Sequence, residues 1–209
     1  MTERPRDLQA FLDRSQAAML ACLPQTGEPI RVARRIDEGL RLSADQAPRT
    51  PSRLPARLPA RLPVCDYIEP ALARARGQGG VIAELADAFA GIERQLYWER
   101  RWTAKAGDEP FFSGHANATI IGPDGLEERD DIWIGVSLLA PGVRYPDHHH
   151  PPQEIYVPLS PGEWFQGGRG WQEPGMGGFV YNTSDIVHAM RSGDHPLLAI
   201  WSLWVTDRV

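Results

Sequence analysis

Residues 142–162 read GVRYPDHHHPPQEIYVPLSPG, and the spacing of their polar side chains predicts a site between two strands. His148 and His150 are two residues apart, so their imidazoles point to the same side of an extended chain. Glu154 and Tyr156 share one face of the next strand for the same reason. The two prolines between these pairs cannot donate ladder hydrogen bonds and force a kink. We therefore expect the two pairs to converge on one point.

This set of side chains is typical of a metal site. Neutral imidazoles and a carboxylate suit a divalent first-row metal, so His148, His150 and Glu154 are candidate ligands. His188 lies 34 residues after Glu154 on an expected returning strand and is the candidate fourth ligand. The donor set accepts Zn, Fe, Mn, Co or Ni and does not choose among them. Three further histidines have no partners at ligand spacing and are expected to be incidental: His115, His149 and His195.

The second half of the chain predicts a mainly β fold. After Gly107, short apolar segments with a period of two alternate with Gly, Pro, Asn and Asp. Short strands without a long helix between them indicate an antiparallel sandwich or barrel. The predicted strands are 115–121, 131–139, 153–158, 163–166, 177–182, 186–191 and 197–205.

The first half is predicted to be helical. Apolar residues recur at helical spacing in three segments, 6–23, 66–76 and 80–97. Between Pro24 and Pro63 this periodicity fades, and residues 48–64 form a Pro/Arg-rich linker whose regularly spaced prolines forbid a continuous helix. We therefore predict two parts, a helical region at 1–110 and a barrel at 111–209.

Composition narrows the class of protein. Apolar residues make up 42% of the chain, yet no run of 18 apolar residues occurs, so no membrane association is expected. The charged N-terminus lacks the zones of a secretory signal, so a cytoplasmic location is expected. Residues 111–209 carry 5 basic and 12 acidic residues, a net charge of −7, which argues against a nucleic-acid partner. The two cysteines, Cys22 and Cys65, are expected to be buried thiols.

The site sequence resembles the cupin motifs. Gly142, His148, His150 and Glu154 match the first motif, G-x5-H-x-H-x3-E-x6-G, whose last glycine comes one residue late. Gly177 and His188 match the second motif, G-x5-P-x-G-x2-H-x3-N, whose Pro, Gly and Asn positions hold Thr183, Asp185 and Ser192. The resemblance implies a cupin-type antiparallel β-barrel, a double-stranded β-helix or jelly roll, with the metal inside and the helical region in front of it.

Within the cupins, about half of the chain resembles the dimethylsulfoniopropionate (DMSP) lyases, through HANATIIGPDGLEERDDIWIGVSLLAPGVRYPDHHHPPQEIY and HAMRSGDHPLLAIWSLW. The resemblance implies that His148, His150, Glu154 and His188 bind a divalent metal. It also implies that Tyr156 is the catalytic base and that Tyr145 lies near the substrate.

The implied substrate is a small zwitterion, a propionate with a distal dimethylsulfonium. We expect the metal to bind its carboxylate and Tyr156 to remove the Cα proton, giving dimethyl sulfide and acrylate. Dimethyl sulfide leaves as a neutral molecule, so a single base is sufficient. Free tyrosine titrates at about 10, and a nearby dication is expected to lower the pKa of Tyr156. Aromatic faces stabilise a sulfonium, for which Trp133 and Tyr181 are candidates.

Two other functions fit the same residues. One is a different metal-dependent cupin enzyme, such as a dioxygenase or a sugar-acid isomerase. The other is a non-enzymatic metal-binding sensor. The chain is compatible with either a monomer or a homodimer.

Overall fold

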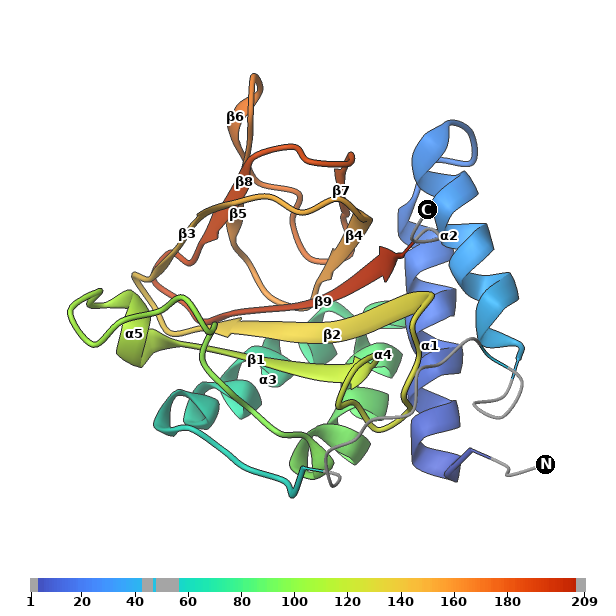
Figure 1. Cartoon of the computed structure of the whole chain (residues 1–209), viewed down its shortest axis with the longest axis horizontal. Coiled ribbons are helices and arrows are strands. Elements are labelled where there is room, and N and C mark those ends of the chain that lie inside the picture. The colour runs from blue at the N-terminus through green and yellow to red at the C-terminus, as the bar shows by residue number, and fades with distance from the viewer. Residues whose placement is uncertain (1–3, 43–46, 48–56, 206–209) are drawn as a thin grey trace.

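The computed structural model describes residues 4–42, 47 and 57–205, and within them the chain forms two antiparallel sheets and a layer of helices (Figure 1). The larger sheet has the strand order β1–β2–β9–β4–β7, and the smaller has the order β3–β8–β5–β6. The larger sheet contains β1 (His115–Ile121), β2 (Ile132–Leu139), β4 (Gln153–Pro158), β7 (Val180–Asn182) and β9 (Leu197–Trp204). The smaller contains β3 (Arg144–His148), β5 (Glu163–Gln166), β6 (Gly170–Gln172) and β8 (His188–Arg191).

The two sheets enclose one apolar core. Alternate residues of each strand point between the sheets, as the period of two requires. Because β3, β5 and β8 belong to one sheet while β4, β7 and β9 belong to the other, the chain crosses repeatedly between the sheets. The side chains of this inner core include Leu139, Tyr145, Tyr156, Trp164, Met190 and Leu197.

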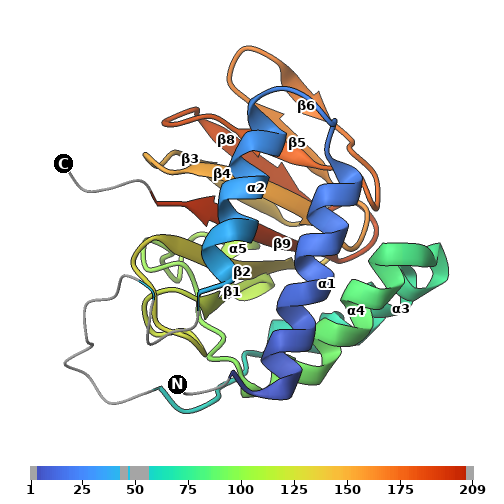
Figure 2. The same ribbon diagram turned by 90° about the vertical axis from the view of Figure 1, so that its right-hand side faces the viewer.

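A second apolar core lies on the other face of the larger sheet, where the helices pack (Figures 1 and 2). Ile134, Val136 and Ile200 contribute from the sheet, and Phe11, Leu85 and Phe89 contribute from the helices. The helices are α1 (Arg6–Cys22), α2 (Glu28–Leu40), α3 (Ile68–Gln78), α4 (Gly80–Ile92) and α5 (Phe111–Gly114), with 3-10 turns η1 (Pro63–Tyr67) and η2 (Glu93–Gln95). Among the described residues, no helix combines the length and the apolar composition that a bilayer crossing requires.

The structure confirms all three helical segments predicted for the first half of the chain, and it contains one further helix between the first and the second. Segment 6–23 forms α1, segment 66–76 falls on η1 and α3, and segment 80–97 forms α4 and η2. The expectation that helical periodicity fades after Pro24 is wrong, because α2 occupies Glu28–Leu40. Its buried residues recur at helical spacing, and charged residues fill the positions between them, as in an amphipathic helix: Ile30, Ala33, Ile36 and Leu40.

All seven predicted strands are present, with β7 shorter than expected, and two strands were not predicted. β6 is only three residues long, and β3 contains a proline and an irregular register, so neither shows a clear period of two. Of the predicted linker 48–64, residues 48–56 lie outside the described residues. In the described part, Ala60 pairs with Tyr97 in an isolated bridge. The division of the chain into two parts at residue 110 stays a prediction. In the structure, the helices and the larger sheet share one apolar core.

Gly135 on β2 is required by close packing against the inner face of the sheet. A Cβ atom at this position would lie 2.1 Å from Trp201 Cζ2 and 2.5 Å from the carbonyl oxygen of Ala118. Both distances are shorter than a van der Waals contact, so any larger residue must displace the indole ring or the neighbouring strand.

We expect Gly135→Ala to lower the free energy of unfolding by about 1–3 kcal/mol, the usual cost of overpacking a core. Denaturant unfolding monitored by circular dichroism measures this change. Gly193→Ala is the matched control, because a Cβ there meets nothing within 4 Å. Equal stability of the two variants would contradict the close packing.

Candidate metal centre

A bulge in β3 brings two polar side chains into the space between the sheets. Tyr145 pairs with Met190 and His148 pairs with His188, so β3 has one residue more than β8 over this interval. In a regular strand, residues three apart point to opposite faces, whereas an extra residue returns both to the same face. Tyr145 and His148 therefore both point inward, and their ring centroids are 5.0 Å apart.

In all three histidines a backbone carbonyl holds the same ring nitrogen, Nδ1. Each Nδ1 lies 2.9 Å from a nearby backbone carbonyl: His148 from Pro146, His150 from Pro152 and His188 from Ile186. A carbonyl can only accept, so each Nδ1 carries the proton and donates it. Each Nε2 is then left with a lone pair. This arrangement is typical of metal-binding histidines, whose other nitrogen is usually held by a carbonyl or carboxylate.

Glu154 on β4 lies at the centre of this group and is 3% exposed. Its Oε2 lies 3.4 Å from His150 Nε2 and 3.3 Å from His188 Nε2. The potential ligand atoms of these three residues all lie within 4.8 Å of one another, which meets the geometric condition for a metal site. His148 lies beside this group, with its ring centroid 4.0 Å from that of His188.

The electrostatics of the group follow from this packing. Burial alone would raise the pKa of Glu154, but the close approach of the His150 and His188 imidazoles holds it well below its usual range. Burial, together with the charge of His188, lowers the pKa of His148 to about 4. Burial also opposes protonation of His150, yet the hydrogen bond and charge of Glu154 outweigh this effect and raise its pKa. Glu154 is thus ionised and His148 neutral at pH 7, as ligands must be.

The residues fit a divalent metal. His188 is 2% exposed, and its Nε2 is a buried nitrogen with no hydrogen-bond partner among the described residues. Such a buried polar atom is costly unless it binds something, and the nearest group is the ionised carboxylate of Glu154. Imidazole nitrogens with one carboxylate suit first-row transition metals.

Two amides that the sequence analysis missed hold Glu154 in place. Asn182 Nδ2 donates to Glu154 Oε2 at 2.9 Å, and Gln166 Nε2 donates to Asn182 Oδ1 at 2.7 Å. Asn182 lies directly opposite Glu154 on β7, whereas Gln166 belongs to the other sheet and lies opposite His188. Only the strand register, which the sequence does not reveal, identifies these residues.

Both predicted catalytic tyrosines lie next to the histidines and Glu154. Tyr156 is 3% exposed and pairs with Trp201, and burial together with the charge of Glu154 raises its pKa well above the usual value. The expected lowering of the Tyr156 pKa would therefore have to come from the metal, because the protein residues alone raise it. The Tyr145 hydroxyl accepts a hydrogen bond from Asn117 Nδ2 at 3.1 Å, and Asn117 Oδ1 accepts one from Ser137 at 2.8 Å.

The two aromatic residues predicted for the sulfonium have different positions. Trp133 pairs with Leu203, which in turn pairs with Glu154, so Trp133 lies on the inner face two strands away from the carboxylate. Tyr181 pairs with Ile155, a residue of the helix-facing core. The structure therefore does not bring Tyr181 to the inner face, because residues on opposite faces of a strand alternate.

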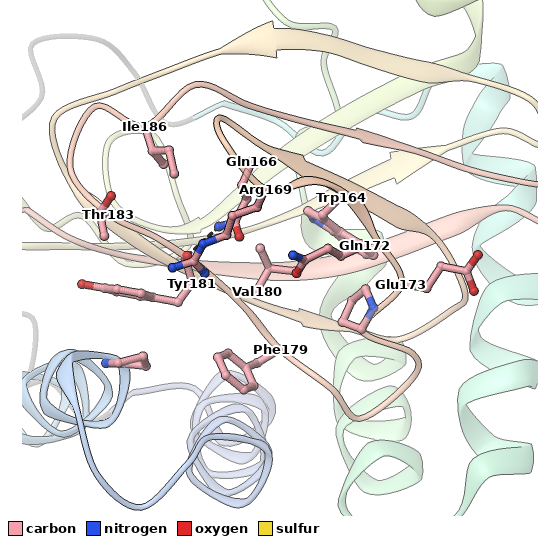
Figure 3. Close-up of a pocket in the computed structure, with 12 residues that line it drawn as sticks. Trp164, Gln166, Arg169, Gln172, Glu173, Phe179, Val180, Tyr181, Thr183 and Ile186 are labelled. Carbon is pink, nitrogen blue, oxygen red and sulfur yellow. Dashed lines mark hydrogen bonds between the residues drawn. The ribbon is translucent and has the colours of Figure 1, made fainter.

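A cavity of about 580 Å³ lies between residues of the two sheets (Figure 3). Trp164 and Gln166 line it from β5, and Val180 and Tyr181 line it from β7, the edge strand of the larger sheet. Gln166 links the cavity to Glu154 through Asn182.

The structure also describes the histidines outside the site and the residues that differ from the second cupin motif. His149 is exposed, with Nδ1 3.6 Å from Asp185 Oδ1, and His195 is exposed near Arg74. Asp185, at the glycine position of the second cupin motif, has a φ of 56°, a left-handed conformation that aspartate tolerates. Ser192, at the asparagine position, accepts from the Val143 N–H and donates to the Ala140 carbonyl.

Comparison with known proteins identifies the family. The dimethylsulfoniopropionate lyase family model matches residues 35–199, and the chain belongs to this family. The dimethylsulfoniopropionate lyase DddQ of Ruegeria pomeroyi is 30% identical over 126 residues, 60% of this chain and 62% of that protein. The putative dimethylsulfoniopropionate lyase DddL of Cereibacter sphaeroides is 26% identical over 119 residues, 56% of this chain and 49% of that protein. The chain thus matches less than two thirds of either relative.

Solved structures confirm the predicted cupin-type fold. The crystal structure of the DMSP lyase DddQ from Ruegeria pomeroyi superposes with a TM-score of 0.70 at 24% identity, covering 97% of this chain and 93% of that one. A chain from the crystal structures of the DMSP lyases RdDddP and RnDddQII has a TM-score of 0.69 at 19% identity, covering 95% and 92%. The match extends over the helical region as well as the sheets.

We expect Asn182→Leu to weaken metal binding about 10- to 100-fold, the usual effect of removing a partner of a ligand. The amide that orients Glu154 is lost, while the ligands remain. Titration of the metal-free protein with Zn²⁺ or Mn²⁺ in a calorimeter measures the affinity. His149→Ala, which removes an exposed histidine of the same segment, should bind as the wild type does. An unchanged affinity of Asn182→Leu would show that Glu154 needs no such support.

Proposed function

We propose that this protein is a metal-dependent DMSP lyase that cleaves the substrate by β-elimination to dimethyl sulfide and acrylate. The observation that carries the proposal is the convergence of His150, His188 and ionised Glu154 around a buried, unpartnered Nε2, with Tyr156 on the same face of β4. Membership of the DMSP lyase family supports this reaction over others.

The metal would be held by Nε2 of His148, His150 and His188 and by the carboxylate of Glu154. When bound, a divalent ion would polarise the substrate carboxylate, make the Cα proton more acidic and stabilise negative charge on the Tyr156 oxygen. The backbone carbonyls that fix each Nδ1–H keep the three rings oriented without further adjustment.

Tyr156 is the base in this proposal. Its oxygen accepts the Cα proton, the electron pair of that C–H bond forms the Cα–Cβ double bond, and the C–S bond breaks with its electrons on sulfur. Dimethyl sulfide leaves as a neutral molecule, so the chain needs no acid on the other side. Burial of Tyr156 keeps water from competing for the proton.

Aromatic side chains next to Tyr156 suit the sulfonium end of the substrate. Trp201 pairs with Tyr156 across β4 and β9, and Trp164 lies with its ring centroid 6.1 Å from that of Tyr156. Cations are stabilised over indole faces by about 0.5–2 kcal/mol. These two tryptophans lie closer to Tyr156 than the predicted Trp133, and Trp164 also lines the cavity.

We expect Tyr156→Phe to abolish release of dimethyl sulfide from DMSP, because the variant has no oxygen to accept the Cα proton. Headspace gas chromatography on metal-reconstituted protein measures the product, and metal analysis of the same samples should give the wild-type content. The ring and its packing against Trp164 are retained, so folding is not the variable.

The reaction should proceed equally well without oxygen. A requirement for oxygen would favour a cupin dioxygenase instead. An active Tyr156→Phe variant would contradict Tyr156 as the base, and a wild-type protein that is inactive with each of Zn, Fe, Mn, Co and Ni would contradict the lyase itself.

A further inference from the structure

Arg101 carries a charged side chain to the edge of the site and has no role in the reaction described above. It lies between Glu99, which pairs with Asn117 in an isolated bridge, and helix α5. Its guanidinium carbon lies 5.5 Å from the centroid of the Tyr145 ring, and that ring lies beside His148. The guanidinium is therefore one aromatic ring away from a proposed metal ligand.

The guanidinium of Arg101 is half-buried and unpaired. Among residues 4–42, 47 and 57–205, its side chain makes neither a hydrogen bond nor an ion pair, and its contact is the Tyr145 face. Three other half-buried or buried arginines each bind a carboxylate, Arg4 with Glu127, Arg129 with Asp131 and Arg191 with Glu163, and half-buried Arg100 donates to the Phe112 carbonyl. A guanidinium without such a partner has its donors free for an anion.

A buried histidine fixes the backbone that presents Arg101. The Arg101 N–H donates to His115 Nε2 at 2.9 Å, so His115 carries its proton on Nδ1, which donates to the Phe111 carbonyl at 2.5 Å. His115 also stacks on the Phe111 ring at 3.7 Å between centroids. Burial lowers the pKa of His115, which keeps it neutral and preserves this pattern. His115 is thus a positioning residue rather than an incidental one.

The charge of Arg101 acts on the side of the site where the tyrosines lie. It lowers the pKa of Tyr145 and of Tyr156 and opposes protonation of His148, although burial is the larger influence on all three. Trp164, by contrast, lies on the side of the open sheet edge. The site therefore has a cationic side and an aromatic side, which matches a substrate with a carboxylate at one end and a soft cation at the other.

We propose that Arg101 binds the carboxylate end of the substrate and selects substrates that carry a carboxylate. This inference rests on the proposed function for the identity of the substrate. A carboxylate has two oxygens with about four acceptor positions, so a carboxylate bound to the metal keeps positions free for the guanidinium. The aromatic side of the site then receives the sulfonium.

The experiment measures binding, so it does not require turnover. The probes are 3-(methylthio)propionate and its amide, which differ only in the charged end. Calorimetric titrations compare metal-loaded wild type, Arg101→Gln and Arg101→Lys with Lys105→Gln, the matched control that removes an exposed charge from the same segment. Metal content and thermal stability are measured on every sample.

We expect Arg101→Gln to bind the carboxylate probe about 10- to 100-fold more weakly, as loss of a charge-assisted hydrogen-bonded pair predicts, and to bind the amide as the wild type does. Arg101→Lys should retain part of the affinity, and Lys105→Gln should retain all of it. The proposal is overturned if Arg101→Gln keeps the wild-type affinity for the carboxylate, if it loses both probes equally, or if the wild type binds neither. A wild type that binds the carboxylate probe through Arg101 but releases no dimethyl sulfide from DMSP would overturn the lyase reaction alone.

Discussion

Glu154 is an ionised carboxylate buried between two sheets, and the cost of that burial explains most of what surrounds it. Moving an unpaired charge from water into a protein interior costs several kcal/mol, so the charge must be matched by donors or cations. His150, His188 and Asn182 approach one of its oxygens. A divalent ion bound by the same residues would complete the compensation.

The core on the helical side of the larger sheet contributes mainly to stability, whereas the core between the sheets contains the residues of the proposed site. The helices bury the outer face of the larger sheet mainly with apolar side chains, whereas the inner face carries the polar cluster among Tyr145, Tyr156 and Trp164. Because the larger sheet is anchored on its helical side, the inner face can hold polar groups that stabilise little by themselves. Gln166 and Asn182 also join the two sheets through hydrogen bonds, so the site stabilises the sandwich that contains it.

Sequence patterns predicted the parts of this molecule that depend on local periodicity or fixed spacing. Alternating residues predicted the long strands. The His-x-His, Glu and distant His pattern identified His150, Glu154 and His188, which the structure places within one cluster, and His148, which lies beside them. Helix α2 was missed although its buried residues recur at helical spacing, whereas β3 was missed because its bulge breaks the period of two.

Residues whose role depends on strand register or on contacts between distant segments of the chain could not be predicted from sequence patterns. Tyr181 and Asn182 are neighbours in the chain, yet only the pairing of β7 with β4 shows that Asn182 meets Glu154 while Tyr181 faces the helices. Arg101 and His115 lie outside every motif, and their relevance depends on a segment folding back against Tyr145.

We expect this cluster to bind one catalytic metal with a position left open toward Tyr156. Anomalous diffraction from crystals of the metal-loaded protein, recorded at the absorption edge of the added metal, locates the ion. We expect one peak bonded to Nε2 of His148, His150 and His188 and to a carboxylate oxygen of Glu154, with water or an added carboxylate on the side of Tyr156. A peak elsewhere, no peak, or a closed site with four protein ligands and no open position would contradict it.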